Sequence, residues 1–395
     1  MTSTCTHFLT FWFVFLTIWI ARFALFLGVG SPSLPSSRCR LIPSEPSTFP
    51  PSSEDLARGK SFYLFVTQGD LHTCFHESSS RAVPGNIWYF DLLEENSLLR
   101  PLLASFDFLP PGSSFQPHGF YLSNRTDTMY VINHAGNYSS VEIFRVEYDV
   151  EGRRPSLRHA RTIASELFRP YSINDVVEGA TSDEIYVTQW LPYGYPIGGK
   201  NHPTSVVERL KNVGTFLFQV LSIRATRVYR CSTRTNAGGG DPCRIATHHR
   251  FIGANGITVD DDRTTVFVSD PAGKEVVVFR RRPEDGWLSR IDRIDLPFAP
   301  DNVEYDDGDL VMGSIPILHT VVYNDGVPAE AQKPVAGGMM VATRRNNRWV
   351  VSNPVMHDGK TLSQISAASR IGDRVFLGSP YSSGVLECRM REERD

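Results

Sequence analysis

Short runs of apolar residues alternate with turn-forming residues along most of the chain. Val, Ile, Phe and Tyr dominate these runs, and Gly, Asn and Asp stand at their ends, which is typical of β-strands joined by turns. The clearest strand patterns span residues 61–67, 86–93, 128–134, 141–148, 184–190, 265–270 and 275–281. Helical periodicity is scarce, so the pattern argues against alternating β-α units and predicts a sandwich, barrel or propeller.

Two segments repeat the same order of features, and this repetition favours the propeller. Residues 117–146 and 254–281 each place a polar residue before an apolar strand, then a turn, a second strand ending in a polar residue, a Gly loop and a third strand. Partial copies begin near residues 173, 300 and 364. Self-similarity over a few tens of residues is typical of repeat folds, in which each copy forms one blade. We therefore expect an all-β protein with a β-propeller fold.

One segment, between Trp190 and Arg227, breaks this rhythm. Apolar residues recur there at helical spacing. They are Val206, Val207, Leu210, Val213, Phe216, Leu217 and Leu221. We expect a helical insertion at about residues 191–226, which is either a surface helix packed on a blade or a lid or membrane-contacting helix beside the active site.

The N-terminus is an almost unbroken apolar run, residues 8–29, with a single charge at Arg22. Such a run is long enough to span a bilayer. We expect residues 1–30 to be a signal-anchor or a cleaved signal peptide. Either places the chain in the secretory pathway, secreted or membrane-anchored, and the apolar segment makes a membrane or lipid surface an expected partner. Residues 31–52, rich in Pro and Ser, predict an extended linker, and residues 53–395 the propeller.

The cysteines fit this compartment, because an oxidising environment permits disulfides. A propeller must tie its first and last strands together, and Cys39 and Cys388 bracket the folded region. We therefore expect a disulfide between them. Cys231 and Cys243 flank a turn-rich loop and form a possible second pair. No CxxC spacing occurs, so a zinc site is not indicated.

Charge and short motifs add two further expectations. The formal net charge of −3 gives no electrostatic reason to expect nucleic acid as a partner. Sequons at Asn124 and Asn137 are candidate glycosylation sites, and they suit a chain in the secretory pathway.

Polar residues stand just before the innermost-strand pattern of several repeats. They are Glu54, Asp55, His118, Asn174, Asp175, Asn255, Asp301 and Asn302. The innermost strands of a propeller line its central channel, so these side chains are expected to converge. A single Asn or Asp before a strand is usually a turn residue, but recurrence at matching positions indicates a shared role. A set of carboxylate and amide oxygens suits Ca²⁺, whose geometry is more flexible than that of Mg²⁺, better than zinc.

These motifs, in this order, resemble those of the serum paraoxonase/arylesterase family. The matching motifs are Ser53-Glu54-Asp55-Leu56, Pro117-His118-Gly119, Asn133-His134, Asn174-Asp175, Ala254-Asn255-Gly256-Ile257 and Asp301-Asn302. The resemblance covers about Cys39 to Cys388. It implies a six-bladed propeller with two calcium ions in its channel, and an enzyme that hydrolyses small-molecule lactones and aryl esters.

The resemblance also implies a role for each matching residue. The ligands of a catalytic calcium would be Glu54, Asn174, Asn255, Asp301 and Asn302. The ligands of a structural calcium would be Asp55, Asp175 and backbone carbonyls near His118 and Phe120. The general base that activates water would be His118, with His134 as its partner, and Asp301 is an alternative base.

Two stretches depart from the family pattern, so the substrate range stays open. They are Thr188-Gln189-Trp190 and Gly313-Ser314-Ile315-Pro316, and both are expected at the rim of the channel. Two other functions are considered: a non-catalytic binding propeller stabilised by calcium, and an enzyme of the gluconolactonase or strictosidine-synthase type. Those enzymes use fewer axial acids, so the pairs Glu54-Asp55 and Asp301-Asn302 favour the calcium-dependent hydrolase.

Overall fold

The structure, a computed structural model, describes most of the chain. The described residues are 17, 37–45, 52–77, 81–94, 97–103, 105–135, 138–149, 154–196, 199–203, 205–234, 240–324, 327 and 331–390. The predicted N-terminal apolar segment, apart from residue 17, lies outside them. Within the described part of the chain, no helix is both long enough and apolar enough to cross a membrane.

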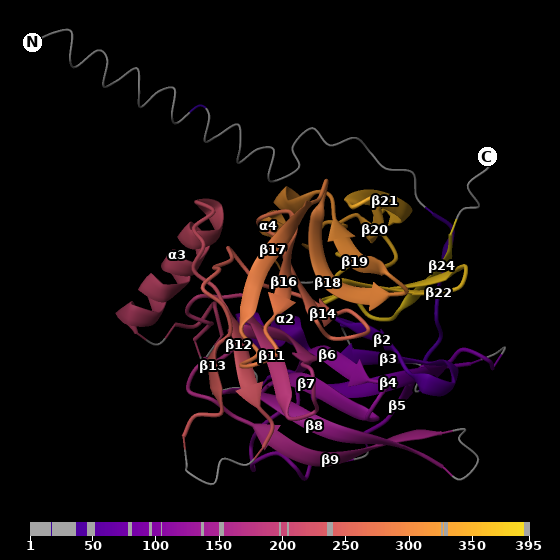
Figure 1. Ribbon diagram of the computed structural model, residues 1–395, viewed down its shortest axis with the longest axis horizontal. Coiled ribbons are helices and arrows are strands. Elements are labelled where there is room, and N and C mark those ends of the chain that lie inside the picture. Colours follow the sequence, from indigo (N-terminus) through magenta and orange to yellow (C-terminus); the bar gives the residue numbers. More distant parts are fainter. Residues whose placement is uncertain are drawn as a thin grey trace, which may run out of the picture.

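Six four-stranded sheets form the six blades of a propeller, which confirms the predicted fold (Figure 1). The first blade contains β2 (Leu56–Arg58), β3 (Tyr63–Gln68), β4 (Asn86–Asp91) and β5 (Arg100–Pro101). The second contains β6 (Pro117–Ser123), β7 (Thr128–His134), β8 (Ser139–Tyr148) and β9 (Pro155–Ile163). The third contains β10 (Ile173–Glu178), β11 (Glu184–Gln189), β12 (Val228–Ser232) and β13 (Cys243–Ile245).

The remaining blades follow the same order, except for the last strand of the sixth. The fourth contains β14 (Ile257–Val259), β15 (Thr265–Asp270), β16 (Glu275–Arg281) and β17 (Leu288–Asp295). The fifth contains β18 (Ala299–Asp306), β19 (Asp309–Ile315), β20 (Gly337–Arg345) and β21 (Arg348–His357). The sixth contains β22 (Ala367–Ile371), β23 (Arg374–Gly378), β24 (Leu386–Arg389) and β1 (Cys39–Leu41).

The innermost strand of each blade faces a common axis. Strands β2, β6, β10, β14, β18 and β22 contact one another in that order, and β22 contacts β2, so they form a closed ring. Strands near the axis, such as β10 and β11, are buried along their whole length, whereas the outer strand β9 alternates buried and exposed residues. This difference explains why the inner strands read as continuous apolar runs.

Apolar side chains fill the space between neighbouring blades. Between the first and second blades, Phe65 packs in one cluster with Phe120 and Phe144. Between the sixth and first blades, Phe376 packs with Leu64. Similar clusters lie between all the other neighbouring blades. Burial of this apolar surface is the main stabilising contribution to the ring.

The chain closes the ring with its two ends. Strand β1 pairs antiparallel with β24, and Cys39, opposite Cys388, is joined to it by a disulfide. Strand β1 therefore lies inside the stretch expected to be a linker. A second disulfide, Cys231–Cys243, joins β12 to β13. The structure thus contains both disulfides expected from the sequence.

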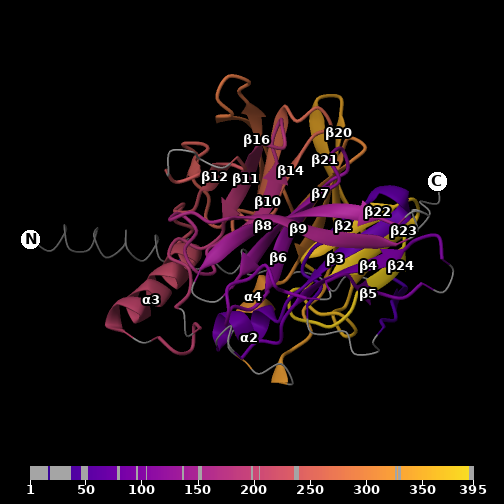
Figure 2. The same cartoon turned by 90° about the horizontal axis from the view of Figure 1, so that it is seen from below.

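Three helices lie together on one face of the ring: α2 (Leu71–His76), α3 (Val206–Val220) and α4 (Leu318–Asn324) (Figure 2). A 3-10 turn, η1 (Lys60–Phe62), separates β2 from β3. Helix α3 forms where the sequence predicts one. Ser205 caps its N-terminus by accepting a hydrogen bond from the Glu208 backbone N–H.

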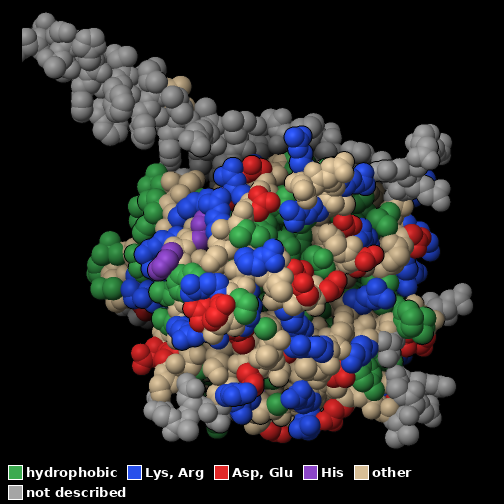
Figure 3. Space-filling model, in the orientation of Figure 1, with side chains coloured by type: hydrophobic (Ala, Val, Ile, Leu, Met, Phe, Trp, Pro, Cys, Tyr) green, Lys and Arg blue, Asp and Glu red, His purple; other side chains and the backbone are tan. Residues whose placement is uncertain are grey.

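The apolar side of α3 faces outward, although one interpretation of the sequence packs it on a blade. Leu210 is 65% exposed and Phe216 50%, and hydrophobic side chains gather over α3 at the left edge of Figure 3. The opposite side holds the helix in place: Phe218 contacts Tyr193, and the Asn212 amide donates to the Lys200 carbonyl.

Candidate active site

The expected calcium ligands stand where the innermost strands begin. Glu54 precedes β2, Asn174 is the second residue of β10, Asn255 precedes β14, and Asp301 and Asn302 belong to β18. These strands come from the first, third, fourth and fifth blades. The ring brings their starting ends together at one end of the axis, as the sequence predicts.

Irregularities in strand pairing occur at these same positions. Register shifts lie between Pro117 and Phe120, between Ile173 and Val176, and between Pro300 and Val303. An extra residue of this kind breaks the ladder locally and redirects side chains. The shifts therefore release His118, Asn174-Asp175 and Asp301-Asn302 from regular pairing.

Two glycines allow the backbones to approach closely near the axis. A Cβ at Gly119 would lie 2.6 Å from an Asp175 carboxylate oxygen, and a Cβ at Gly256 would lie 2.7 Å from the Asn302 Cα. Any side chain at either position would displace a candidate ligand.

Hydrogen bonds connect the candidate ligands. The Asn302 Nδ2 donates to the Glu54 carbonyl oxygen at 2.9 Å and to Glu54 Oε1 at 3.0 Å. Glu54 Oε1 is also 3.5 Å from His118 Nε2, and Asn174 Nδ2 lies 3.5 Å from the same nitrogen. Glu54, Asn174, Asn302 and His118 therefore form one continuous group.

Four oxygens of the candidate ligands are buried without a hydrogen-bond partner among the described residues. They are Glu54 Oε2, Asn174 Oδ1, Asn255 Oδ1 and Asn302 Oδ1. Buried oxygens normally have a partner, because an unsatisfied one costs free energy. The unpaired atoms are oxygens of four of the five expected ligands, so the residues present fit a hard cation such as Ca²⁺.

The two carboxylates of this set strongly resist ionisation on their own. Burial and the negative charges of Asp55 and Asp301 raise the pKa of Glu54 well above its usual value. Burial also raises the pKa of Asp301 to about 8, against the effect of a hydrogen bond from Asn255. A cation among them would favour their ionised forms.

Asp55 and Asp175 form a second group further along the axis. Asp55 Oδ2 accepts from the Phe120 N–H at 2.9 Å, and Asp175 Oδ2 accepts from the Ile257 N–H at 2.8 Å, so each aspartate joins its blade to the next. Burial raises the pKa of Asp55 to about 7. The expected metal contact of the Phe120 carbonyl stays a prediction.

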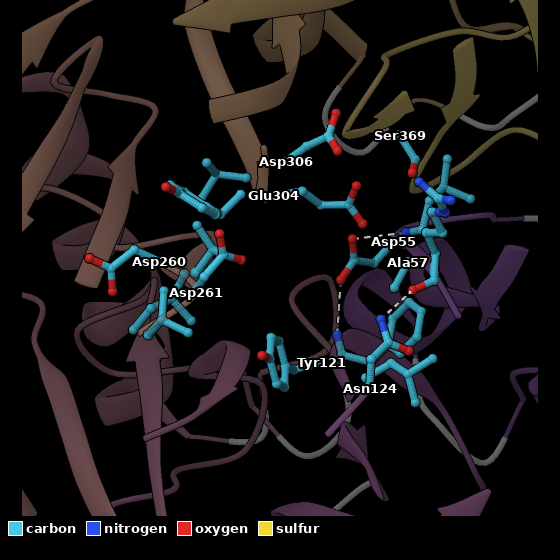
Figure 4. Close-up of a pocket in the computed structure, with 18 of the residues that line it drawn as sticks. Asp55, Ala57, Tyr121, Asn124, Asp260, Asp261, Glu304, Asp306 and Ser369 are labelled. Atoms are coloured by element: carbon cyan, nitrogen blue, oxygen red, sulfur yellow. Dashed lines mark hydrogen bonds between the residues drawn. The ribbon is translucent and has the colours of Figure 1, made fainter. Parts of the chain in front are cut away.

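Asp55 and Asp175 line a cavity of about 410 Å³, which is also lined by Arg58, Asn124 and Asp260 (Figure 4). In the described part of the chain, no three His, Cys, Asp or Glu side chains are already close enough to hold one metal ion. The first group contains carboxamides as well as carboxylates.

A pair of histidines adjoins the first group. His118 Nδ1 and His134 Nε2 are 3.0 Å apart, and His134 Nδ1 lies 2.9 Å from the Ser139 hydroxyl. Burial lowers the pKa of His118 to about 3, and burial together with His118 lowers that of His134 well below its usual value. Both imidazoles are therefore neutral near pH 7, and each has one ring nitrogen without a proton.

An aromatic cover over this pair is not indicated by the sequence. Phe75, on α2, has its ring centroid 5.6 Å from that of His118 and 5.5 Å from that of His134. Trp190, in one of the stretches that depart from the family pattern, lies 6.1 Å from His118. A helix of six residues gives too little periodicity to be recognised, so this cover appears only in the folded structure.

Hydroxyl groups from neighbouring strands hold the backbone of the candidate ligands. Thr188 Oγ1 accepts from the Asp175 N–H and donates to the Asn255 carbonyl, which joins the third blade to the fourth. Ser269 Oγ donates to the Asp301 carbonyl, and Ser366 Oγ donates to the Glu54 carbonyl. Thr188 and Ser269 lie near the end of the second strand of their repeats. The polar end of that strand is visible in the sequence and is the signal that points to them.

The two sequons lie outside this centre. Asn124 is exposed in the turn between β6 and β7, and its side-chain amide donates to the Arg58 carbonyl. Asn137 lies outside the described residues. Glycosylation of either residue stays a prediction.

The chain is a closed propeller with polar side chains gathered on its axis, and comparison with known proteins identifies its family. The family model named Arylesterase matches residues 68–194 and 223–389, which is most of the chain. The chain belongs to the arylesterase family, and it is an enzyme of the esterase and lactonase class.

Curated proteins of this family cover a similar share of the chain. Human serum paraoxonase/lactonase 3 is 28% identical over 314 residues, which are 78% of this chain and 77% of the human protein. Bovine serum paraoxonase/arylesterase 2 is 26% identical over 313 residues, which are 78% of this chain and 77% of the bovine protein. Among solved structures, the aldose sugar dehydrogenase of Streptomyces coelicolor has a TM-score of 0.48 at 12% identity, and covers 91% of this chain and 99% of its own.

Proposed function

We propose that the protein is a calcium-dependent hydrolase of lactones and aryl esters. The observation that carries the proposal is the group of buried, unpaired oxygens from Glu54, Asn174, Asn255 and Asn302 beside the His118–His134 pair. Family membership and the names of the curated relatives support the substrate class.

Five residues would hold a catalytic ion: Glu54, Asn174, Asn255, Asp301 and Asn302. When bound there, Ca²⁺ supplies a Lewis acid that polarises the substrate carbonyl and stabilises the oxyanion formed from it. A second, structural ion would be held by Asp55, Asp175 and the Phe120 carbonyl.

Side chains of the protein would accept the proton released by the attacking water. We assign His118 as the base that takes a proton from the attacking water, because its Nε2 lies 3.5 Å from Glu54 and from Asn174, beside their unpaired oxygens. His134 would orient His118 through their 3.0 Å contact, and Ser139 would orient His134. Asp301 is the alternative base, since its carboxyl group belongs to the same centre.

The aromatic cover would exclude water from this centre. Phe75 is 2% exposed and packs against His118, His134 and Trp190. Its exclusion of solvent would strengthen the electrostatic interactions inside the site.

The disulfides and the surface support a location in the secretory pathway. Two disulfides are consistent with the secretory pathway, as expected from the sequence. The exposed apolar side of α3, together with residues 8–29, would contact a membrane or lipid surface.

A substrate panel tests the proposed function. Purified protein is assayed on aliphatic lactones, aromatic lactones and phenyl acetate, with calcium and with excess chelator. Calcium-dependent hydrolysis of at least one group supports the proposal. Absence of turnover on every substrate, in protein that binds calcium, would support the binding-propeller alternative instead.

A further inference from the structure

A threonine hydroxyl supports the backbone where the third blade turns two polar residues toward the axis. The register shift between Ile173 and Val176 leaves Thr188, on β11, opposite Asn174 and Asp175. A shift of this kind removes the regular ladder partner of a backbone N–H, and a buried N–H needs another acceptor. Thr188 Oγ1 accepts a hydrogen bond from the Asp175 N–H at 3.0 Å. The hydroxyl therefore takes the place of the missing ladder bond.

The same hydroxyl reaches the next blade. It donates to the Asn255 carbonyl oxygen at 2.5 Å, and Asn255 precedes β14 of the fourth blade. The Asp175 carbonyl oxygen is farther away, at 3.3 Å. Thr188 is fully buried, so solvent does not compete for either bond. One side chain thus ties the backbone beside Asn174 to the backbone of Asn255.

Serine hydroxyls make a similar contact at two other junctions between blades. Ser269 is the second-last residue of β15, as Thr188 is of β11, and its Oγ donates to the Asp301 carbonyl of the fifth blade at 2.6 Å. Ser366 precedes β22 of the sixth blade, and its Oγ donates to the Glu54 carbonyl, just before the first blade, at 2.7 Å. At each junction the hydroxyl belongs to one blade and the carbonyl belongs to a candidate ligand of the next.

These backbone contacts matter because the ligand oxygens themselves are not held. Asn174 Oδ1 and Asn255 Oδ1 have no hydrogen-bond partner among the described residues. The positions of these two oxygens therefore depend on the backbone that carries them. Groups that orient metal ligands from behind typically change metal affinity by about 10- to 100-fold when they are mutated.

We propose that Thr188 is a positioning residue for the catalytic calcium, and that Ser269 has the same role at the next junction. This inference rests on the proposed function, which places the ion among the side chains of Asn174, Asn255 and Asp301. Neither hydroxyl is a candidate ligand, and each holds the backbone of one. Without the hydroxyl, the ligand backbones of neighbouring blades are no longer tied together, so calcium binding weakens.

The test compares Thr188→Val and Thr188→Ser with the wild-type protein. Valine keeps the branched shape of the side chain and removes the hydroxyl, whereas serine keeps the hydroxyl and removes the methyl group. Calcium binding is measured by equilibrium dialysis at a series of buffered free calcium concentrations. Thermal unfolding is recorded with excess chelator, so that the stability of the chain is measured separately from its affinity for the ion.

The matched control is Thr128→Val. Thr128 is the first residue of β7, which is also the second strand of its blade, and its side chain is buried. Its hydroxyl donates to the Thr126 carbonyl and accepts from Arg145, and neither partner is a candidate ligand. The control therefore measures the effect of removing a buried threonine hydroxyl from a second strand away from the candidate ligands.

Thr188→Val should bind one ion on the order of 10- to 100-fold more weakly than the wild type. Thr188→Ser should bind it with an affinity close to that of the wild type, because the hydroxyl is retained. Thr128→Val should lower the melting temperature in chelator, as Thr188→Val does, but leave calcium affinity unchanged. Ser269→Ala should weaken the binding of the same ion.

The failures of this inference and of the proposed function are distinguishable. Wild-type calcium affinity in Thr188→Val would overturn the positioning role and leave the proposed function intact. An equal loss of affinity in Thr188→Ser would also overturn it, because the hydroxyl would then not be the group that matters. If the wild type itself binds no calcium, the proposed function fails together with this inference. If Thr188→Val does not fold, Ser269→Ala replaces it, and wild-type affinity in that variant overturns the role of both hydroxyls.

Discussion

His118 Nδ1 lies 3.0 Å from His134 Nε2, so one imidazole orients the other beside the buried oxygens of Glu54 and Asn174. His118 Nδ1 faces His134, so His118 Nε2 is the ring nitrogen that faces the ligand group.

Replacing His118 by Gln tests this role. General-base catalysis typically contributes about 10²- to 10⁴-fold to a rate. We expect kcat for lactones to decrease by a factor within that range. Calcium affinity should change little, because the side chain of residue 118 is not a candidate ligand and Gln keeps the polarity of the site. His134→Gln should give a smaller loss. Wild-type turnover in His118→Gln would assign the base to another group, with Asp301 the first to examine.

Removing charge from the catalytic calcium site should weaken calcium binding as well as turnover, unlike the change at His118. Glu54→Gln or Asp301→Asn replaces one of its two carboxylates by a neutral amide. We expect weaker calcium binding and lower turnover on every substrate, measured by metal titration and by kcat on lactones and phenyl acetate. Glu284→Gln, at an exposed acid in the turn between β16 and β17, is the control and should leave both unchanged.

Chelation should abolish activity and then lower stability. With no cation, the acids on the axis are either protonated or repel one another, and a ligand that binds only the folded state stabilises it by mass action. We expect the melting temperature to rise with free calcium concentration. Equal activity and equal melting temperature with and without chelator would contradict the metal assignment.

The disulfide that closes the ring should contribute more stability than the one within the third blade. Cys39 and Cys388 are separated by 349 positions, and Cys231 and Cys243 by 12. Replacing Cys39 and Cys388 by Ala should cost about 2 to 5 kcal/mol of unfolding free energy, because the unfolded chain gains entropy that grows with loop length. The same change at Cys231 and Cys243 should cost less in a chemical denaturation experiment.

The outward side of α3 should bind lipid. Leu210→Glu and Phe216→Glu each place a charge on this side, and we expect weaker binding to phosphatidylcholine vesicles for a chain that begins at residue 37. Gln219→Glu is the control, because this residue lies on the less exposed part of the helix. Equal vesicle binding by all three variants would mean that α3 has no part in the contact.

Much of the fold was predictable because strand patterns and turn residues repeat locally. The positions of Glu54, Asn174, Asn255 and Asp301 were predictable for the same reason, since each stands at the same point of a repeat. Helix α3 was also predictable from its spacing. That its apolar side faces outward was not, because periodicity alone does not show what covers a helix.

Phe75 and Glu304 were not predictable from local pattern. Phe75 belongs to a six-residue helix that is fixed by the Asp70 cap, which accepts from the Thr73 N–H, and by packing on aromatic rings from other blades. Glu304 reads as an ordinary polar residue of a strand. It lines the same cavity as Asp55 and Asp175 only because the ring closes.

The bond between Cys39 and Cys388 also makes the polypeptide topologically circular over the propeller. A protease that cuts one loop between blades converts this circle into a linear chain but releases no fragment, so nicked and intact protein should separate only after reduction. The sixth blade is then one of several equivalent places for chain ends. A permuted gene, with residues 39 and 388 joined by a short peptide and new ends between two other blades, should encode the same ring.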